Sequence, residues 1–199
     1  MNVKIYVEGG SQGSAKSACR MAFRLFLEKV VPAGSFAVVA LGDRAAAFRG
    51  FCLALQENRR DFLILLVDSE ESVSTGAWEH LAAREEDQWQ RPHTATNDQA
   101  HLMVQVMESW FLADREALTA YYGHGFLSDS LPGQRNVELV AKRDLFRALD
   151  RASRHTKKGT YHKTRHGFDL LERLDPQRVR AASAHADRLF LVLQRETTD

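Results

Sequence analysis

Three acidic side chains stand after apolar runs, a position where a bound cation could be held. Glu8 follows the run 3–7, Asp68 follows the run 62–67, and Glu70 comes two positions later. Parallel sheets place functional groups at the carboxyl ends of their strands. Residues i and i+2 of an extended segment point the same way, so Asp68 and Glu70 could share one cation. Glu8 would face the same crevice if the two strands are near neighbours.

These three acids are all suited to binding a divalent metal ion. Mg²⁺ takes oxygen ligands from one or two carboxylates, together with waters and phosphate. We therefore predict a site for Mg²⁺ or Mn²⁺ formed by Asp68, Glu70 and Glu8. The alternative is that acids at strand ends cap helices or are simply solvated.

The segment after the first strand also resembles a phosphate-binding loop. Residues 10–17, Gly-Ser-Gln-Gly-Ser-Ala-Lys-Ser, come close to G-x-x-x-x-G-K-[ST] between a strand and a helix. Asp68 would then be the strand-end aspartate that holds Mg²⁺ in a P-loop nucleotidase. Ala15 replaces the second glycine, and its Cβ would crowd a backbone that must wrap a phosphate. The nucleotidase is therefore a minor alternative, although Gly10 and Lys16 could still contact a phosphate at the helix N-terminus.

The C-terminal third of the chain is basic. Residues 142–199 hold 14 Lys and Arg against 8 Asp and Glu, whereas residues 1–141 hold 13 against 18. An acidic and a basic region in one small protein suit a metal-dependent enzyme that acts on a polyanion, although two solvated faces of opposite sign are the alternative. Lys163 could stabilise charge that develops on a cleaved phosphate. The other side chains expected to meet phosphates are Lys157, Lys158, Arg165 and His166.

The elements that must position these residues follow a β-α-β-α-β order. Apolar runs at 3–7, 36–41 and 62–67 alternate with segments of helical spacing at 15–30 and 45–55. Continuous apolar strands separated by helices indicate a parallel sheet that is covered on both faces.

Beyond residue 70 the pattern is less regular. Residues 71–98 are expected to form a loop with one helical turn near 78–84, followed by a fourth strand at 101–107. A helix is then expected from Glu108 towards Tyr122, so Glu108 would be either a further acid of the site or an N-terminal cap. The basic part is predicted to be helical at 142–153, 167–174 and 176–194, with Gly159 and Gly167 as helix breakers.

Composition limits the class of protein. The chain has 199 residues, of which 44% are apolar and 27% are charged, as expected for one globular domain over 1–199 with a basic helical part from about 142. No apolar run reaches the roughly 18 residues of a membrane helix, and we expect no signal peptide before the first strand. Cys19 and Cys52 offer neither a disulfide framework nor zinc-ligand spacing. We therefore expect a cytoplasmic protein with no membrane contact.

Five stretches of the chain resemble one bacterial family over nearly its whole length. They are residues 6–10, 66–70, 98–105, 107–114 and 161–163. The family is domain of unknown function 4276, and it is similar to Toprim, the α/β fold of topoisomerases, primases and overcoming-lysogenization-defect nucleases. The resemblance implies that Glu8 handles protons and that Asp68 and Glu70 bind Mg²⁺, although Toprim enzymes have aspartate at the position of Glu70.

We therefore expect an α/β, Toprim-like protein with a mainly parallel sheet, flanking helices and a helical C-terminal extension. It would be a Mg²⁺- or Mn²⁺-dependent nuclease, with Glu8, Lys163 and Glu108 as catalytic residues and nucleic acid as its partner. The resemblance also implies a role in phage defence with a separately encoded ATPase. The first alternative is a non-catalytic binding subunit of such an ATPase complex, and the second is the P-loop nucleotidase.

Overall fold

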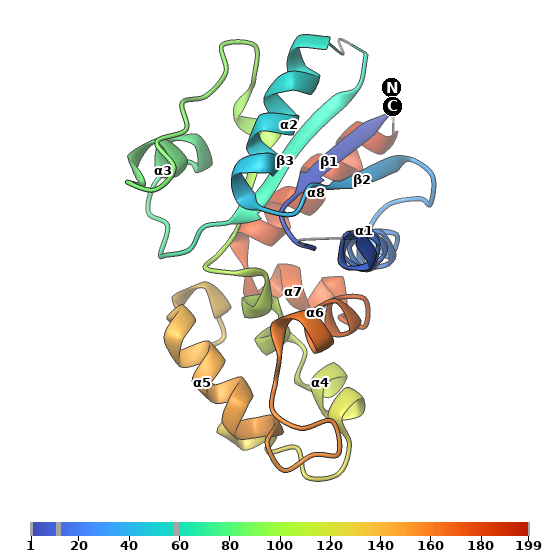
Figure 1. The fold of residues 1–199 in the computed structure, drawn as a ribbon, viewed down its shortest axis with the longest axis vertical. Coiled ribbons are helices and arrows are strands. Elements are labelled where there is room, and N and C mark those ends of the chain that lie inside the picture. The colour runs from blue at the N-terminus through green and yellow to red at the C-terminus, as the bar shows by residue number, and fades with distance from the viewer. Residues whose placement is uncertain (1, 11–12, 58–59, 199) are drawn as a thin grey trace.

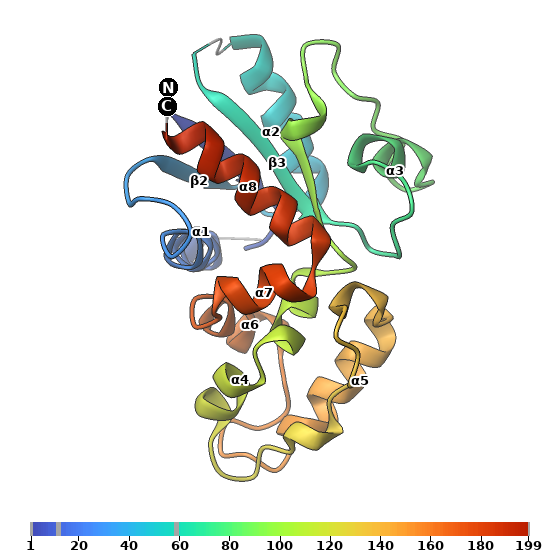
Figure 2. The ribbon, with the colours of Figure 1, turned by 180° about the vertical axis from the view of Figure 1, so that it is seen from behind.

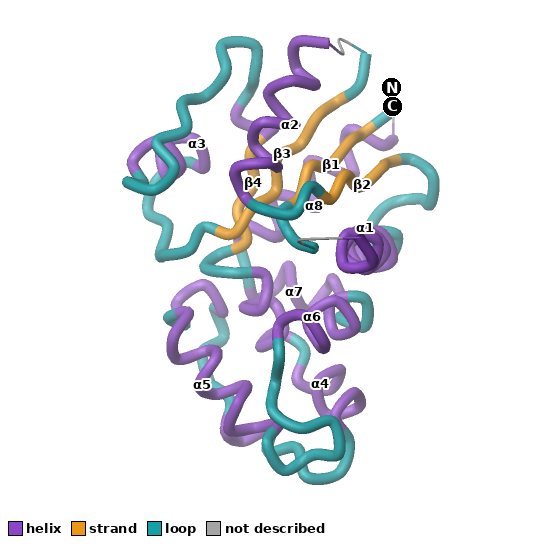
Figure 3. The backbone as a smooth tube through the Cα atoms, viewed as in Figure 1, coloured by secondary structure: helices purple, strands orange, loops and turns teal. Residues whose placement is uncertain are grey.

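The computed structural model describes residues 2–10, 13–57 and 60–198. A parallel four-stranded sheet lies in the upper part of the molecule as drawn in Figure 3. Its order is β2-β1-β3-β4, so β1 and β3 are neighbours in the middle of the sheet. The strands are β1 (Val3–Val7), β2 (Phe36–Ala40), β3 (Phe62–Asp68) and β4 (Ala100–Met103).

Helices cover both faces of this sheet, as the continuous apolar strands predict. Helix α1 (Gly13–Leu27) and helix α8 (Ala184–Thr198) pack on the face that carries Ile5. Helix α2 (Arg44–Glu57) and helix α3 (Ala77–Ala83) pack on the opposite face. Figures 1 and 2 show α2 in front of the sheet and α8 behind it.

A group of shorter helices faces the carboxyl ends of the strands. Figure 1 shows these helices below the sheet, and the chain then returns through α8 to cover the sheet. They are α4 (Arg115–Tyr122), α5 (Lys142–Ser153), α6 (Lys163–Leu171) and α7 (Pro176–Ala182). The 3₁₀ turns are η1 (Asn97–Gln99), η2 (Met107–Ala113), η3 (Ser128–Ser130) and η4 (Val137–Leu139).

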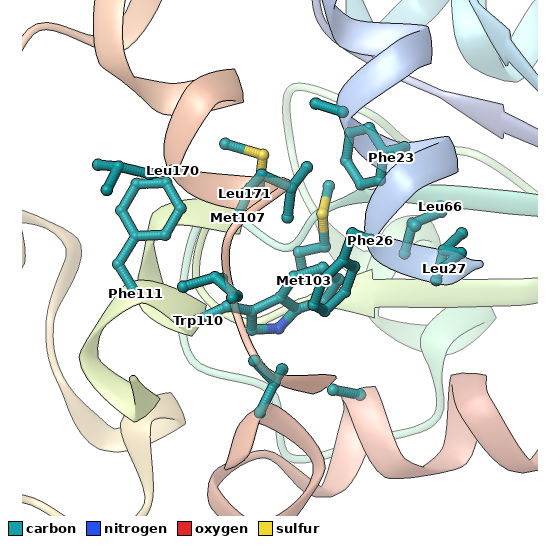
Figure 4. Close-up of a cluster of buried hydrophobic side chains, with 14 of the residues drawn as sticks. Phe23, Phe26, Leu27, Leu66, Met103, Met107, Trp110, Phe111, Leu170 and Leu171 are labelled. Carbon is teal, nitrogen blue, oxygen red and sulfur yellow. The ribbon is translucent and has the colours of Figure 1, made fainter. Parts of the chain in front are cut away.

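One apolar cluster joins the sheet to the helical part. Figure 4 shows Phe26 from α1 beside Trp110 from η2, and Phe23 from α1 and Leu170 and Leu171 from α6 belong to the same cluster. The rings of Phe26 and Trp110 are stacked with their centroids 5.6 Å apart. This packing fixes α6 and η2 relative to the strand ends, where the predicted site lies.

The region after β3 corrects two predictions. The fourth strand is shorter than expected because β4 ends at Met103. The single helix expected from Glu108 to Tyr122 is instead the turn η2 followed by α4. The break falls at Asp114, whose Oδ1 accepts a hydrogen bond from Ala117 N at 3.1 Å and so begins a new helix.

The C-terminal helices also differ from the predicted boundaries. Helix α6 begins at Lys163 and runs through Gly167, which the sequence suggested as a breaker. A Cβ at Gly167 would lie 3.2 Å from the hydroxyl oxygen of Tyr161, so this glycine serves close packing rather than a helix end. The helix predicted at 176–194 is divided at Ser183, whose hydroxyl accepts from Ala186 N at 3.1 Å.

Candidate metal centre

The candidate site lies where the order of the strands reverses. The chain proceeds from β1 outward to β2 and then returns to β3 on the other side of β1. Open α/β sheets bind their ligands at the carboxyl ends of the strands that flank such a switch point. Glu8 directly follows β1, and Asp68 is the last residue of β3. The expectation that these two strands are neighbours is therefore confirmed.

The three predicted ligands converge at this point. Glu8, Asp68 and Glu70 each place a carboxylate oxygen within 4.8 Å of the others. The Asp68 N–H donates to Glu8 Oε1, and Asp68 Oδ1 accepts from Met107 N at 2.7 Å. Each bond orients one carboxylate by engaging one of its oxygens, and the second oxygen of each carboxylate is left for a ligand.

The backbone conformation of Glu70 differs from the extended one that the sequence predicts. Its backbone is not extended but left-handed, with φ 68°, a conformation that is uncommon for residues other than glycine. Glu70 N donates to Gln105 O at 2.7 Å, and the Glu70 carboxylate pairs with Lys142 Nζ. A strained backbone persists only where its surroundings fix it, and such residues cluster at functional sites.

The electrostatics of the cluster disfavour the charged forms of two of its carboxylates. Burial raises the pKa of Glu8, because the charged form loses its hydration. Burial also raises the pKa of Asp68 well above its ordinary value, and the nearby charges of Glu8 and Glu108 raise it further. Asp68 is only 3% exposed. Two adjacent carboxylates are thus costly to ionise together unless a cation neutralises them.

Glu108 provides a fourth, fully buried carboxylate beside the three. It lies on η2, and its Oε1 accepts a hydrogen bond from the Tyr161 hydroxyl at 2.9 Å. Lys163 Nζ lies 3.8 Å from this oxygen and 3.7 Å from Asp68 Oδ2, so it connects Glu108 to the cluster. Burial acts to lower the pKa of Lys163, but Glu108 and Asp68 together raise it, so the ammonium stays charged.

The other oxygen of Glu108 lacks a hydrogen-bond partner among the residues that the structure describes. An unpaired buried oxygen of this kind is costly unless water or an ion satisfies it. The prediction that Glu108 belongs to the site rather than capping a helix therefore gains support from the geometry.

Two further cations contact the cluster, and the sequence analysis missed both. Arg44 begins α2, and its guanidinium lies 3.4 Å from Glu8 Oε1 and also donates to the backbone carbonyl of Asp68. Asp87 holds Arg44 with bonds of 2.9 and 2.5 Å, and Lys142 at the start of α5 pairs with Glu70. Arg44 carried one signal, because it follows the second strand at the same edge of the sheet as the acids.

The predicted phosphate loop is described only in part, because residues 11–12 lie outside the described ranges. Gly10 has φ 71°, and a Cβ there would lie 2.4 Å from the carbonyl oxygen of Ala15. Glycine is therefore required by the tight turn into α1. Lys16 is half-buried on α1, and within the described ranges it makes no ion pair with the carboxylates.

Among the predicted phosphate-binding cations, Lys163 alone reaches the described carboxylates. Lys157, Lys158 and Arg165 are exposed, and Lys158 Nζ lies 4.4 Å from the ring centroid of Tyr121. His166 corrects the prediction, because it is only 6% exposed and its Nδ1 accepts from His162 N at 3.1 Å. Burial lowers the pKa of His166, which leaves it neutral and unsuited to binding phosphate as a cation.

A cavity of about 280 Å³ opens beside the carboxylates. Its lining includes Glu8, Asp68 and Lys163 together with apolar side chains from α1, α6, η2 and the end of β4. The cavity gives a ligand direct access to the two most central carboxylates. The site thus combines three carboxylates that could hold a metal ion, the ammonium group of Lys163 and an adjoining cavity.

The comparison with protein families gives a match that covers most of the chain. A family model described as Domain of unknown function (DUF4276) matches residues 7–194, and the chain therefore belongs to this family. No curated protein and no solved structure matched the chain. Over the described part of the chain, no helix combines the length and apolar character needed to cross a membrane. The family description names no activity, so function is argued from the site.

Proposed function

We propose that the protein is a metal-dependent phosphodiester hydrolase that acts on nucleic acid. The observation that carries this proposal is the convergence of Glu8, Asp68 and Glu70 within 4.8 Å at the switch point of the sheet. Their oxygen ligands suit Mg²⁺ or Mn²⁺. When bound, such a cation supplies charge neutralisation and a water activated near neutral pH.

The side chains around the cation would have separate roles in proton transfer and in stabilising charge on the phosphate. Glu8 has a raised pKa, which moves it towards the range in which a carboxylate exchanges protons efficiently near neutral pH. Lys163 is 59% exposed and faces both Asp68 and Glu108, so its ammonium group can reach a phosphate and stabilise developing charge. Glu108 holds Lys163 in this position from the buried side.

The resemblance of the chain to Toprim proteins supports more specific proposals about its fold type, location and partner. We assign its α/β sheet to the Toprim type and place the protein in the cytoplasm, where nucleic acid is accessible. A separately encoded ATPase and a role in phage defence belong to the same proposal. A purification of the chain with its genomic neighbour would test the partnership.

One observation favours a second candidate function, that of a non-catalytic subunit. Each of the three carboxylates already contacts a cation of the chain, through Arg44, Lys163 and Lys142 respectively. Such a balanced network can hold a fold together without catalysis. In that case the protein would present a binding surface to the ATPase.

A cleavage assay separates the two functions. Full-length protein is incubated with single-stranded DNA, duplex DNA or RNA, in Mg²⁺, Mn²⁺ or EDTA. We expect metal-dependent cleavage that Glu8→Gln lowers by about 10²–10⁴-fold, the usual contribution of a general acid or base. The matched control is Glu71→Gln, because Glu71 is 61% exposed and pairs with Arg84 outside the cluster.

The outcomes of this assay are distinct. Full cleavage by a folded Glu8→Gln variant would contradict the proposed role of Glu8. No metal-dependent cleavage by the wild type, with or without the ATPase, would contradict the hydrolase and support the binding subunit.

A further inference from the structure

The cavity beside the metal centre has walls of two different kinds. Its acidic edge holds Glu8 and Asp68, and Lys163 is the cation among its described lining residues. Its lining also includes four large apolar side chains, Phe23, Met103, Met107 and Phe168. Figure 4 shows three of these, Phe23, Met103 and Met107, within the same apolar cluster.

The glycines at the strand ends leave this space open. A Cβ at Gly9 would lie 3.4 Å from Cζ of the Phe168 ring and 3.0 Å from Cys19 Sγ. Gly9 and Gly10 line the cavity without side chains of their own. The backbone therefore approaches the Phe168 ring closely, and the ring itself is half-buried rather than sealed in the core.

These walls do not fit a phosphate backbone alone. A groove that follows the backbone is typically lined with cations along its length. Here one ammonium group stands beside the carboxylates and most of the remaining lining is apolar, as in pockets that bind small organic ligands. A nucleotide carries both parts in one molecule: a phosphate for the carboxylates and the metal, and a base whose flat ring face can stack on Phe168.

We propose that the cavity receives one nucleobase of the substrate, while the adjoining phosphate lies at the metal centre. This inference rests on the proposed nuclease function and deepens it. A base inside a duplex is stacked and paired, so it must be extruded before it can enter such a pocket. The substrate class is therefore single-stranded nucleic acid, or a strand with an already unpaired nucleotide.

The first arm of the test uses small probes and the intact protein. A nucleoside 5′-monophosphate and ribose 5-phosphate share the sugar and the phosphate and differ in the base. We expect the nucleotide to inhibit cleavage at least about tenfold more strongly, the order expected when a base stacks on an aromatic side chain. Phe168→Ala should remove most of this difference, and Phe168→Leu should remove part of it.

The control for packing is Phe126→Ala. Phe126 is half-buried like Phe168, but it stacks on Tyr122, with ring centroids 5.2 Å apart, outside the cavity lining. Thermal melts establish that each variant is folded. Phe126→Ala should retain the preference for the nucleotide.

The second arm compares oligonucleotides in the same cleavage assay. A single strand should be cleaved faster than its duplex, and replacing its nucleotides by abasic residues should lower the rate at least about tenfold. Equal cleavage of intact and abasic strands, or equal inhibition by the two small probes, would overturn the base pocket and leave the nuclease intact. The absence of cleavage of every substrate would instead be a failure of the proposed function.

Discussion

Asp68→Asn removes one charge from the most buried carboxylate of the metal centre and keeps its shape. The asparagine oxygen can still accept the hydrogen bond from Met107 N, which is 2.7 Å long in the wild type. Because burial, Glu8 and Glu108 all raise the pKa of Asp68, its ionised form is unfavourable in the metal-free fold. We therefore predict that Asp68→Asn melts at or above the wild-type temperature in EDTA, and that it loses the stabilisation by metal.

The size of the metal effect follows from linkage. A ligand at about 100 times its Kd adds about 2.7 kcal/mol to the free energy of unfolding. For a chain of this length, 1 kcal/mol shifts Tm by about 2–4 °C. The wild type should thus gain roughly 5–10 °C in saturating Mn²⁺ or Mg²⁺, and Asp68→Asn only a small fraction of that.

Thermal melts in EDTA, Mg²⁺ and Mn²⁺ measure both effects, with Glu71→Gln as the control. A folded Asp68→Asn variant that keeps the full rise in Tm would refute the assignment and move the metal elsewhere. A variant that melts far below the wild type in EDTA would refute the argument about buried charge.

The pH dependence of the same melts has a defined sign. The folded pKa values of Asp68 and Glu8 are raised, so the folded state holds protons that the unfolded state releases. The free energy of unfolding of the metal-free protein should therefore fall as pH rises from the ordinary carboxyl range through the folded pKa values. Asp68→Asn should flatten this fall, whereas the rise in Tm caused by metal should grow with pH because the metal binds the ionised forms.

Three further predictions concern the cations. If Lys157 and Lys158 both contact phosphates, replacing them with Ala should make the salt dependence of binding to single-stranded nucleic acid weaker. The slope of the logarithm of the association constant against the logarithm of the salt concentration, measured by fluorescence anisotropy, should fall by about 1.4. An unchanged slope would exclude both lysines from the interface. Lys142→Met should tighten Mn²⁺ binding, by at most about fivefold in a calorimetric titration, because the ammonium no longer competes for Glu70; weaker binding would show that Lys142 helps to form the site. Lys16→Ala should change cleavage less than tenfold, whereas loss of turnover would favour a nucleotide-binding loop.

The central part of the fold was predictable because it depends on local patterns. Apolar runs without polar alternation predict buried parallel strands, and the acids that follow β1 and β3 were placed correctly at their carboxyl ends. The order of the strands was not predictable, because it depends on packing between distant segments. The prediction that Glu8 and Asp68 converge therefore depended on the assumption that β1 and β3 are neighbours, which the structure confirms.

The remainder of the site depends on contacts that no local pattern contains. Lys142 pairs with Glu70 across 72 positions, and Arg44 approaches Glu8 across 36. Charge composition indicated a basic C-terminal region but could not show that Lys163 reaches the carboxylates while Lys157 does not. The helix that carries Lys163 was predicted to begin at residue 167 instead of Lys163, because Gly167 was interpreted as a break.

Further misses arose from backbone geometry. Glu70 was expected in an extended segment, yet it reaches the cluster through a left-handed conformation that hydrogen bonding to Gln105 O fixes. His166 was expected to contact phosphate together with its basic neighbours. Its position on the inner face of α6 instead buries it against Tyr122, with 3.2 Å between the Tyr122 hydroxyl oxygen and His166 Nδ1.

The central claim is that Glu8, Asp68 and Glu70 form one divalent-cation site. Crystals of the full-length protein soaked in Mn²⁺ test it most directly, because anomalous scattering locates manganese independently of the fitted side chains. The account predicts an anomalous peak within coordination distance of oxygens from all three carboxylates, and no such peak in crystals of Asp68→Asn. Manganese bound elsewhere, or three carboxylates still paired only with Arg44, Lys142 and Lys163 in saturating Mn²⁺, would contradict it.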